Sequence, residues 1–398
     1  MSVPTERGAR SGHDRSFAAL LVVTAGAFVG YVLLLPVVPL WAVRSGAGET
    51  GAGLTNGVFM LVTVLTQLMM PWLLRTRSPR SLLAVGTLLL GAGAPLFGLF
   101  TTLPGLLAVS GVRGVGFGLL TVTGSALVAE LVPAHRRGRA SGLYGLAVGL
   151  PHAVMLPVGV RLAELLGFVP LFWIAAVVPA LAATAAAGLG RATTPFRDRP
   201  PEGRTPLTRG LLMPWLAMTP VSVAAGGLVA FLPLAVGSGA GSAGLLTFGA
   251  ATVGFRWVAG HLGDRFGSAR LLLPAVSVAA VGLVALALGS TGNGWLAVLG
   301  TFGVGAGFGG LQNAALVLMF ERAPAGAAST AWNIAYDAGN GIGSAGLGAV
   351  VAAGGYPTGF LTCAALVAAG FPAALHVARR ARRAVTPTSP ASRGGRNR

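Results

Sequence analysis

Residues 16–43 read SFAALLVVTAGAFVGYVLLLPVVPLWAV, a run of 28 residues without a charged side chain. A helix needs about 20 apolar residues to cross the ~30 Å hydrocarbon core of a bilayer. Because a backbone in lipid must pair its own N–H and C=O groups, the run predicts a membrane-spanning helix. It is also longer than the roughly 7–15 apolar residues of a cleaved signal peptide, so we expect the helix to remain in the protein.

Similar apolar runs recur along the whole chain and predict twelve spans in two sets of six. The first set is predicted at residues 16–43, 48–74, 80–100, 104–132, 138–165 and 167–190. The second set is predicted at residues 210–236, 242–263, 269–289, 294–320, 327–355 and 356–378. We therefore expect an all-α integral membrane protein whose twelve transmembrane helices form two pseudo-symmetric six-helix bundles.

The composition excludes several classes of protein. Charged residues make up 10% of the chain, against about 25% in soluble domains, so a water-soluble globule is excluded. The net charge of +18 does not indicate nucleic acid, because the arginines that carry it sit in short loops and tails rather than in a basic domain. Cys363 is the only cysteine, which excludes an internal disulfide and a paired-cysteine metal site. We expect no cofactor, and the chain has no P-loop for ATP.

The arginines also predict the orientation in the membrane. All but four of the 28 fall in segments on one side of the predicted spans; the exceptions are Arg44 and Arg161 on the other side, and Arg113 and Arg256 within spans. Since basic loops stay in the cytoplasm, both termini are predicted there, in the cell membrane. Residues 1–15 and 191–209 then form a cytoplasmic tail and linker, and residues 379–398 form a basic tail predicted to be disordered.

An internal repeat relates the two predicted bundles. Gly116-Phe117-Gly118 matches Gly307-Phe308-Gly309, and residues 130–133 (ELVP) match residues 321–324 (ERAP), both at an offset of 191. A six-helix unit repeated in the same orientation is typical of two packed halves with a binding site between them.

The junction of the eighth and ninth predicted spans reads GHLGDRFGSAR at residues 260–270. It resembles the cytoplasmic loop signature of the major facilitator superfamily. RGVGFG at residues 113–118 is similar to that family's membrane-embedded arginine motif, and residues 130–139 are similar to its loop between the fourth and fifth spans. The resemblance covers residues 16–380 and implies a transporter, not an enzyme, whose two halves rock about a central site.

The resemblance also implies a gate that holds the cytoplasmic side shut. Carried over to this chain, the gate comprises Gly260, Asp264, Arg265, Gly267, Arg270, Arg139 and Glu130. Asp264 at a helix end could accept hydrogen bonds from N–H groups at a neighbouring helix N-terminus, where the helix dipole favours an anion. The first half departs from the pattern, because Leu74 stands where the acid would be, so a symmetric double lock is not expected. The alternative is a polar loop that only sets topology.

Polar residues recur at helical spacing in two predicted spans. Asn333, Asp337, Asn340 and Ser344 share one face of the eleventh span, and Asn56, Met60, Thr63 and Gln67 share one face of the second. The family's fold places these spans opposite each other, so we expect the two stripes to meet. Asp337 is the predicted proton-coupling residue, because desolvation disfavours its charged form. A hydrogen-bonded structural aspartate is the alternative.

The remaining predicted pathway residues are Arg113, Tyr31, His152, Gln312 and Asn313. An arginine within a span is costly and therefore predicts function, although it could also snorkel or bind carbonyl groups. His152 could carry a proton or simply be packed. Arg256, two turns before Asp264, is expected to brace the loop signature. Gly145 and Gly149 lie in a stretch that only partly matches the family's antiporter motif, because Leu156 replaces a usual glycine.

Three functions compete. The favoured one is proton-coupled export of a small amphipathic or lipophilic compound, a drug or natural product, because few embedded charges predict a largely apolar cavity. The second is proton-coupled uptake of a small neutral metabolite. The third is a multi-span membrane enzyme, which is disfavoured because no histidine pairs with an acid at a ligand spacing within a span. The expected partners are a small-molecule substrate, protons and lipid, without nucleic acid; the sequence permits a monomer and does not name the substrate.

Overall fold

The computed structural model describes residues 6–132, 137–190, 209–323 and 325–385, and every regular element in them is a helix. The first half contains α1 (Glu6–Leu34), α2 (Val37–Arg44), α3 (Gly48–Thr76), α4 (Pro79–Ala92), α5 (Leu96–Leu99), α6 (Leu103–Leu131), α7 (Arg137–Leu166), α8 (Phe168–Thr184) and the 3-10 helix η2 (Ala185–Leu189). The second half contains α9 (Arg209–Val236), α10 (Ser238–Phe266), the 3-10 helix η3 (Ser268–Arg270), α11 (Leu272–Gly289), α12 (Gly294–Phe320), α13 (Ala325–Ala369) and α14 (Phe371–Val385).

Ten helical stretches of the described chain are long and apolar enough to cross a bilayer. They do not include α10, whose many glycines and Arg256 lower its hydropathy, although its 29 residues match the length of α3. One of the ten, Thr330–Arg380, is 51 residues long and holds two spans. Counting α10 and dividing this stretch gives the predicted twelve.

The division falls at Gly355, which has φ 77° and ψ 172° inside α13. Gly359 lies against Leu347 and Val351, earlier in the same helix. Residues twelve apart in a straight helix are separated by ~18 Å, so the chain must turn back at Gly355. Gly167 and Gly237 have nearly the same dihedral angles between α7 and α8 and between α9 and α10. These values suit glycine alone, so three hairpins of the bundle each depend on one residue without a Cβ.

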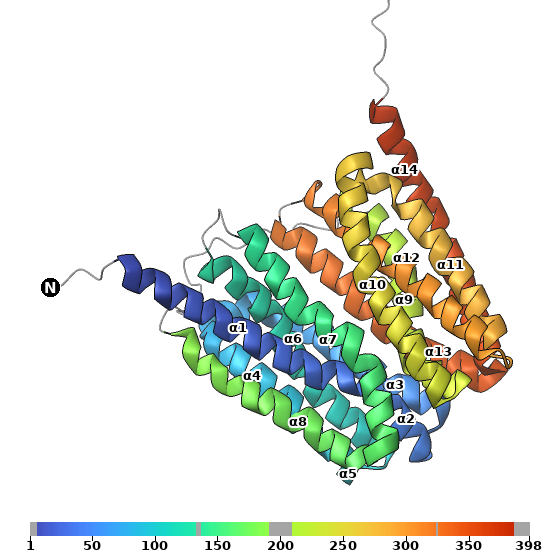
Figure 1. The fold of residues 1–398 in the computed structure, drawn as a ribbon, viewed down its shortest axis with the longest axis horizontal. Coiled ribbons are helices and arrows are strands. Elements are labelled where there is room, and N and C mark those ends of the chain that lie inside the picture. The colour runs from blue at the N-terminus through green and yellow to red at the C-terminus, as the bar shows by residue number, and fades with distance from the viewer. Residues whose placement is uncertain (1–5, 133–136, 191–208, 324, 386–398) are drawn as a thin grey trace, which may run out of the picture.

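The predicted repeat is visible in the helix boundaries. α3 and α10 are each 29 residues long and begin 190 residues apart, and α6 and α12 begin 191 residues apart. Figure 1 shows the two bundles, α1–α8 and α9–α14, leaning toward each other where α2, α3 and α13 meet. They spread toward the end at which α1 begins and α14 ends. We call this the arginine-rich end, after Arg75, Arg265, Arg270 and Arg380.

Small residues close the seam between the bundles at the opposite end. There α3 packs on α13 and α7 packs on α10. Gly53 lies against the Ser344 backbone, and a Cβ built on Gly57 would be 2.8 Å from the Ala345 Cβ. Such close approach is typical of membrane helices that pack through small side chains. Nearer the arginine-rich end, a Cβ on Gly145 of α7 or Gly254 of α10 would meet no atom within 4 Å. The seam is therefore shut at one end and open toward the other.

Several boundaries differ from the predicted spans, and α1 already begins at Glu6, within the predicted N-terminal tail. The first run breaks at Leu35 and Pro36 into α1 and the short α2, and the third divides into α4 and α5. The last helix runs to Val385, beyond the predicted end at residue 378. Residues 191–208 of the predicted linker and residues 386–398 of the predicted tail lie outside the described residues.

Candidate functional site

A small cavity lies where the two bundles meet. Seven helices from both bundles line it: α1, α3 and α7 on one side, and α9, α10, α12 and α13 on the other. The lining includes Tyr31, Asn56, His152, Tyr336 and Asn340. Its volume is about 30 Å³, enough for one or two water molecules. Ligand pockets usually measure roughly 300–1,000 Å³, so the bundles must separate further to admit a larger molecule.

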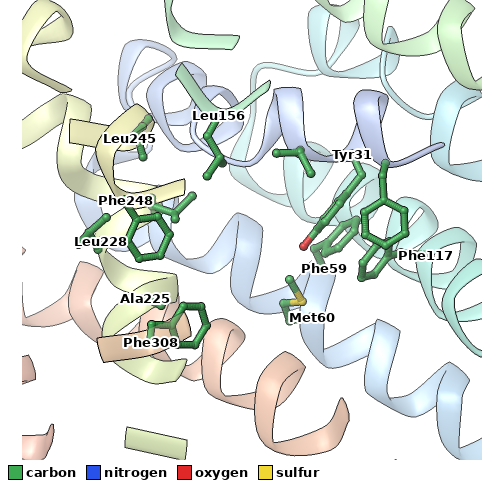
Figure 2. Packing of buried hydrophobic residues seen from close by; sticks show 14 of the residues in the cluster. Tyr31, Phe59, Met60, Phe117, Leu156, Ala225, Leu228, Leu245, Phe248 and Phe308 are labelled. Carbon is green, nitrogen blue, oxygen red and sulfur yellow. The ribbon is translucent and has the colours of Figure 1, made fainter. Parts of the chain in front are cut away.

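Aromatic rings form both walls of this cavity. On the first-bundle side, the Tyr31 ring stacks on Phe117 and Phe59, with ring centroids 4.0 and 5.4 Å apart. On the second-bundle side, Phe248 stacks on Phe308 at 6.0 Å. Figure 2 shows these two groups facing each other with Met60 below the space between them. The walls are apolar and planar, and they suit a ligand with an apolar or aromatic body.

On the second-bundle side the rings continue toward the arginine-rich end. Tyr336 stacks on Phe308 at 5.8 Å and on Trp332 at 5.4 Å. Phe308, Tyr336 and Trp332 therefore form a continuous ladder, which we call the aromatic ladder. It leads from the cavity along α13 toward the open part of the seam.

A partly buried side-chain hydrogen bond joins the two bundles across the seam. Gln67 Nε2 of α3 donates to Asp337 Oδ2 of α13 at 2.7 Å. The same nitrogen lies 3.3 Å from Thr121 Oγ1, which holds the amide from within the first bundle. Asp337 is 4% exposed, and the Gln67 Oε1 atom is buried without a partner. The predicted meeting of the two polar stripes is confirmed at this pair.

The other members of the stripes serve mostly local structure. Asn56 donates to the Leu35 carbonyl at 3.0 Å. In a continuous helix this carbonyl would accept from the N–H of residue 39, but that residue is Pro39, which has no N–H. Asn340 donates to the Tyr336 carbonyl at 2.8 Å. Thr63 turns away from the seam and donates to Gly114 O at 3.1 Å, inside its own bundle. Asn56 and Asn340 still reach the cavity, whereas Thr63 does not.

His152 and Tyr31 lie together at the cavity, their ring centroids 5.9 Å apart. His152 Nδ1 is 3.2 Å from the Val148 carbonyl one turn earlier, so this nitrogen is occupied within α7. Asn333 is half-buried on the same helix as Asp337, and Asn313 lies near Gly260, at 3.7 Å from a Cβ built there.

Arg113 lies inside the first bundle and not at the cavity. Its Nε donates to the Leu90 carbonyl at 3.0 Å and a terminal nitrogen donates to Gly30 O at 3.4 Å. The guanidinium carbon also lies 5.8 and 5.6 Å from the ring centres of Phe59 and Phe97. Only 3% of the residue is exposed. This geometry is that of a carbonyl-bound structural arginine, the alternative considered from the sequence.

Arg256 takes a position that the sequence did not indicate. It was expected to brace the loop signature, but it reaches across to α12 and α13. One terminal nitrogen donates to Gln312 Oε1 at 3.3 Å, and the guanidinium carbon lies 5.6 Å from the Trp332 ring centre. The Trp332 indole N–H in turn donates to the Gln312 carbonyl at 3.1 Å. The signal that could have revealed this is helical spacing: Gly249, Val253 and Arg256 share one face of α10.

Among the described residues of the predicted gate, Asp264 forms no ion pair with Arg265 or Arg270. Asp264, Arg265 and Arg270 are exposed at the arginine-rich end, and the Asp264 carboxylate has no bonded partner among the described residues. Gly267, with φ 84°, forms the tight turn after α10. Glu130 is exposed, and the side chain of Arg139 lies outside the described part of the chain. The bundles are apart at this end, so the gate stays a prediction for another state. No group of three metal-binding side chains occurs among the described residues.

Comparison with known proteins gives consistent matches. The family model described as "Major Facilitator Superfamily" matches residues 20–345. Uncharacterized MFS-type transporters from two strains of Mycobacterium tuberculosis are 36% identical over 110 residues. That match covers 27% of this chain and 16% of theirs.

Solved structures share the fold at low sequence identity. An auto-inhibited peptide transporter of the POT family has a TM-score of 0.76 at 14% identity, covering 96% of this chain and 99% of that one. A bacterial homologue of the human lysosomal transporter Spinster, in an inward-facing and unoccupied conformation, has a TM-score of 0.72 at 14% identity, covering 98% of this chain and 100% of that one. At these identities the likeness shows the fold alone.

Proposed function

Because the chain belongs to the major facilitator superfamily, in which it is a secondary transporter and not an enzyme, we propose that it exports a small amphipathic compound in exchange for protons. The compound would be a drug or natural product, and its export would confer resistance on the cell. The proposed cycle is alternating access, in which the two bundles rock about the cavity between them. We place the protein in the cell membrane with both termini in the cytoplasm, as a monomer. A fluorescent tag on the C-terminus that is found outside the cell would overturn that orientation.

The observation that carries the proposal is the Gln67–Asp337 hydrogen bond. It ties a buried acid of the second bundle to the first bundle, and it lies at the seam where the bundles must part. A bond to a charged acceptor is stronger than one to a neutral acid. Protonation of Asp337 would therefore weaken the link between the bundles and couple proton binding to their separation.

The surroundings of this pair favour an amphipathic substrate. Tyr31, Phe248 and Phe308 supply apolar walls, while Asn56 and Asn340 supply the amide groups at the cavity. A site of this kind binds an apolar body and fixes its orientation through a few polar contacts. With the arginine-rich end in the cytoplasm, the open part of the seam would receive substrate from inside the cell.

The test uses inside-out membrane vesicles whose interior is acidified, with a panel of neutral, cationic and anionic amphipathic dyes. We expect dye to accumulate inside, since export in the cell corresponds to uptake here. Asp337→Asn should abolish the accumulation that depends on the pH gradient, because an amide cannot release a proton. Glu321→Gln is the matched control, since Glu321 is an exposed acid at the end of α12 and lies outside the seam contacts described above.

Two results would contradict the proposal. Dye loss from the acidified vesicles would indicate proton-coupled uptake into cells instead of export. Accumulation by Asp337→Asn that still follows the pH gradient would remove Asp337 from the coupling mechanism. Chromatography of the variant as a single folded species excludes misfolding as the cause of any loss.

A further inference from the structure

One face of α10 follows the seam from its closed part to its open part. Gly249 packs against α7, with a built Cβ 2.9 Å from the Ala153 Cα, and Val253 lies 4.0 Å from a Cβ built on Gly149. Arg256 is the next residue of this face toward the arginine-rich end. A Cβ on Gly145, one turn further along α7, would meet nothing within 4 Å. Arg256 therefore stands where the two bundles begin to separate.

The Arg256 side chain borders an opening and is not packed in a core. It is exposed, and it contacts Gln312 of α12 and Trp332 of α13. Its guanidinium lies over Trp332, which stacks on Tyr336 of the cavity lining. Arg256 is therefore at the mouth of the cavity already described.

No acid neutralises this arginine within the described residues. The ion pair found there is Arg161–Glu164, on the surface of α7. Asp337, the residue after Tyr336, has its carboxylate bound by Gln67. The bonded partner of Arg256 is a neutral amide oxygen, that of Gln312. An arginine within a membrane span is costly, and Arg113 shows how this chain satisfies a purely structural one, with two carbonyl groups and full burial. Arg256 has neither.

The chemistry beside Arg256 is aromatic. Its guanidinium lies over Trp332, the outer ring of the aromatic ladder that leads to Tyr336 and Phe308. Across the seam, α7 exposes Leu146 and Leu150. A ligand held here would place an anionic group at Arg256 and a planar apolar body along the ladder. Guanidinium groups bind carboxylates and sulfonates through paired N–H donors.

We propose that Arg256 binds the anionic group of the substrate, so that the protein transports small aromatic anions such as carboxylates or sulfonates. The inference rests on the proposed export function, whose substrate it restricts to one charge class. It predicts that the protein binds two molecules of equal shape with different affinity when they differ only in charge.

The test compares tritiated 2-naphthoate with uncharged 2-naphthamide, which has nearly the same shape. Binding is measured by scintillation proximity on the whole protein in phosphatidylcholine nanodiscs, at neutral pH and without a gradient. We expect the wild-type protein to bind naphthoate at least about tenfold more tightly than naphthamide, since only the carboxylate can form charge-assisted hydrogen bonds with the guanidinium. Arg256→Gln should reduce this ratio to within about twofold, mainly by loss of naphthoate binding. Arg256→Lys should retain part of the preference, because it keeps the charge and loses the paired donors.

Arg161→Gln is the control for overall charge and should leave the ratio unchanged. The proposal is overturned if wild-type protein binds no naphthoate, if the ratio survives Arg256→Gln, or if Arg256→Gln and Arg256→Lys lose both ligands equally. It is also overturned if phosphatidylglycerol in the nanodiscs abolishes naphthoate binding, because the arginine would then hold a lipid headgroup. Naphthoate binding that is intact without any gradient-driven accumulation would instead refute proton-coupled export and leave the anion site standing.

Discussion

The proposed coupling of proton binding to bundle separation depends on two side chains, Gln67 and Asp337. We expect Gln67→Leu to destabilise the protein by about 1–3 kcal/mol, because a buried acceptor loses its donor. The loss should be larger at alkaline pH, where the carboxylate is charged, than at acidic pH, where it is neutral. Unfolding can be followed with a thiol-reactive dye, since Cys363 is the only cysteine and is buried.

Thr121→Val provides the matched comparison for this prediction. It removes the other hydrogen bond of the Gln67 amide and leaves Asp337 untouched. It should lower the melting temperature by the same small amount at both pH values. A pH-independent loss in Gln67→Leu as well would mean that the contact is only structural.

Spacing in the sequence predicted some residues of the site and misjudged others. The meeting of the α3 and α13 stripes was predicted correctly at Gln67 and Asp337, because helical periodicity fixes which side chains share a face, but Thr63 of the same stripe turns into its own bundle. Periodicity does not fix where that face points. The two embedded arginines show this: Arg113 turns into its own bundle, while Arg256, expected to brace a loop, faces the seam. The direction depends on how the helices pack, and that cannot be read from one helix alone.

At the scale of the helices, glycine decides where α3 and α13 can touch. A side chain at Gly53 would lie against the Ser344 backbone, which cannot move without shifting α13. Gly53→Ala should therefore destabilise the closed seam by about 1–3 kcal/mol, measured as a lower melting temperature. Gly145→Ala is the control, since a Cβ there meets nothing within 4 Å and alanine favours the helix. Equal effects of the two changes would contradict the packing described for α3 and α13.

The helices also show what hydropathy can and cannot predict. Apolar runs located the spans, because the requirement to cross lipid governs composition over twenty or more residues, although the hydropathy of α10 is too low to mark it as a span. Hydropathy did not predict the break between α1 and α2, because the apolar run is continuous across Pro36. The interruption is visible only in the structure, where α1 ends at Leu34 and α2 begins at Val37. The hairpin at Gly355 was placed correctly, between the spans predicted at 327–355 and 356–378, because an apolar stretch of that length must hold two crossings.

At the scale of the whole molecule, the bundles meet at one end and are apart at the other (Figure 1). This is one of two arrangements that alternating access requires. The predicted gate around Asp264 lies at the open end, so its contacts are expected in the alternate arrangement, where the arginine-rich end would be closed. The repeat of about 190 residues explains why two arrangements are available: two similar bundles can rock about one seam without unfolding either.

A disulfide across the closed end tests that motion directly. In a Cys363→Ala background, we expect the pair Gly57→Cys and Ala345→Cys to cross-link on mild oxidation. A Cβ on Gly57 would be 2.8 Å from that of Ala345. A disulfide needs a Cβ–Cβ distance of roughly 3.5–4.5 Å, so the two helices would have to move apart by less than about 2 Å to form it. Oxidation should stop gradient-driven accumulation in vesicles, because the closed end can no longer open, and reduction should restore it. Each single cysteine variant should be insensitive to the oxidant. Full transport by the cross-linked protein would show that substrate does not pass between the bundles, and the rocking mechanism would then have to be abandoned.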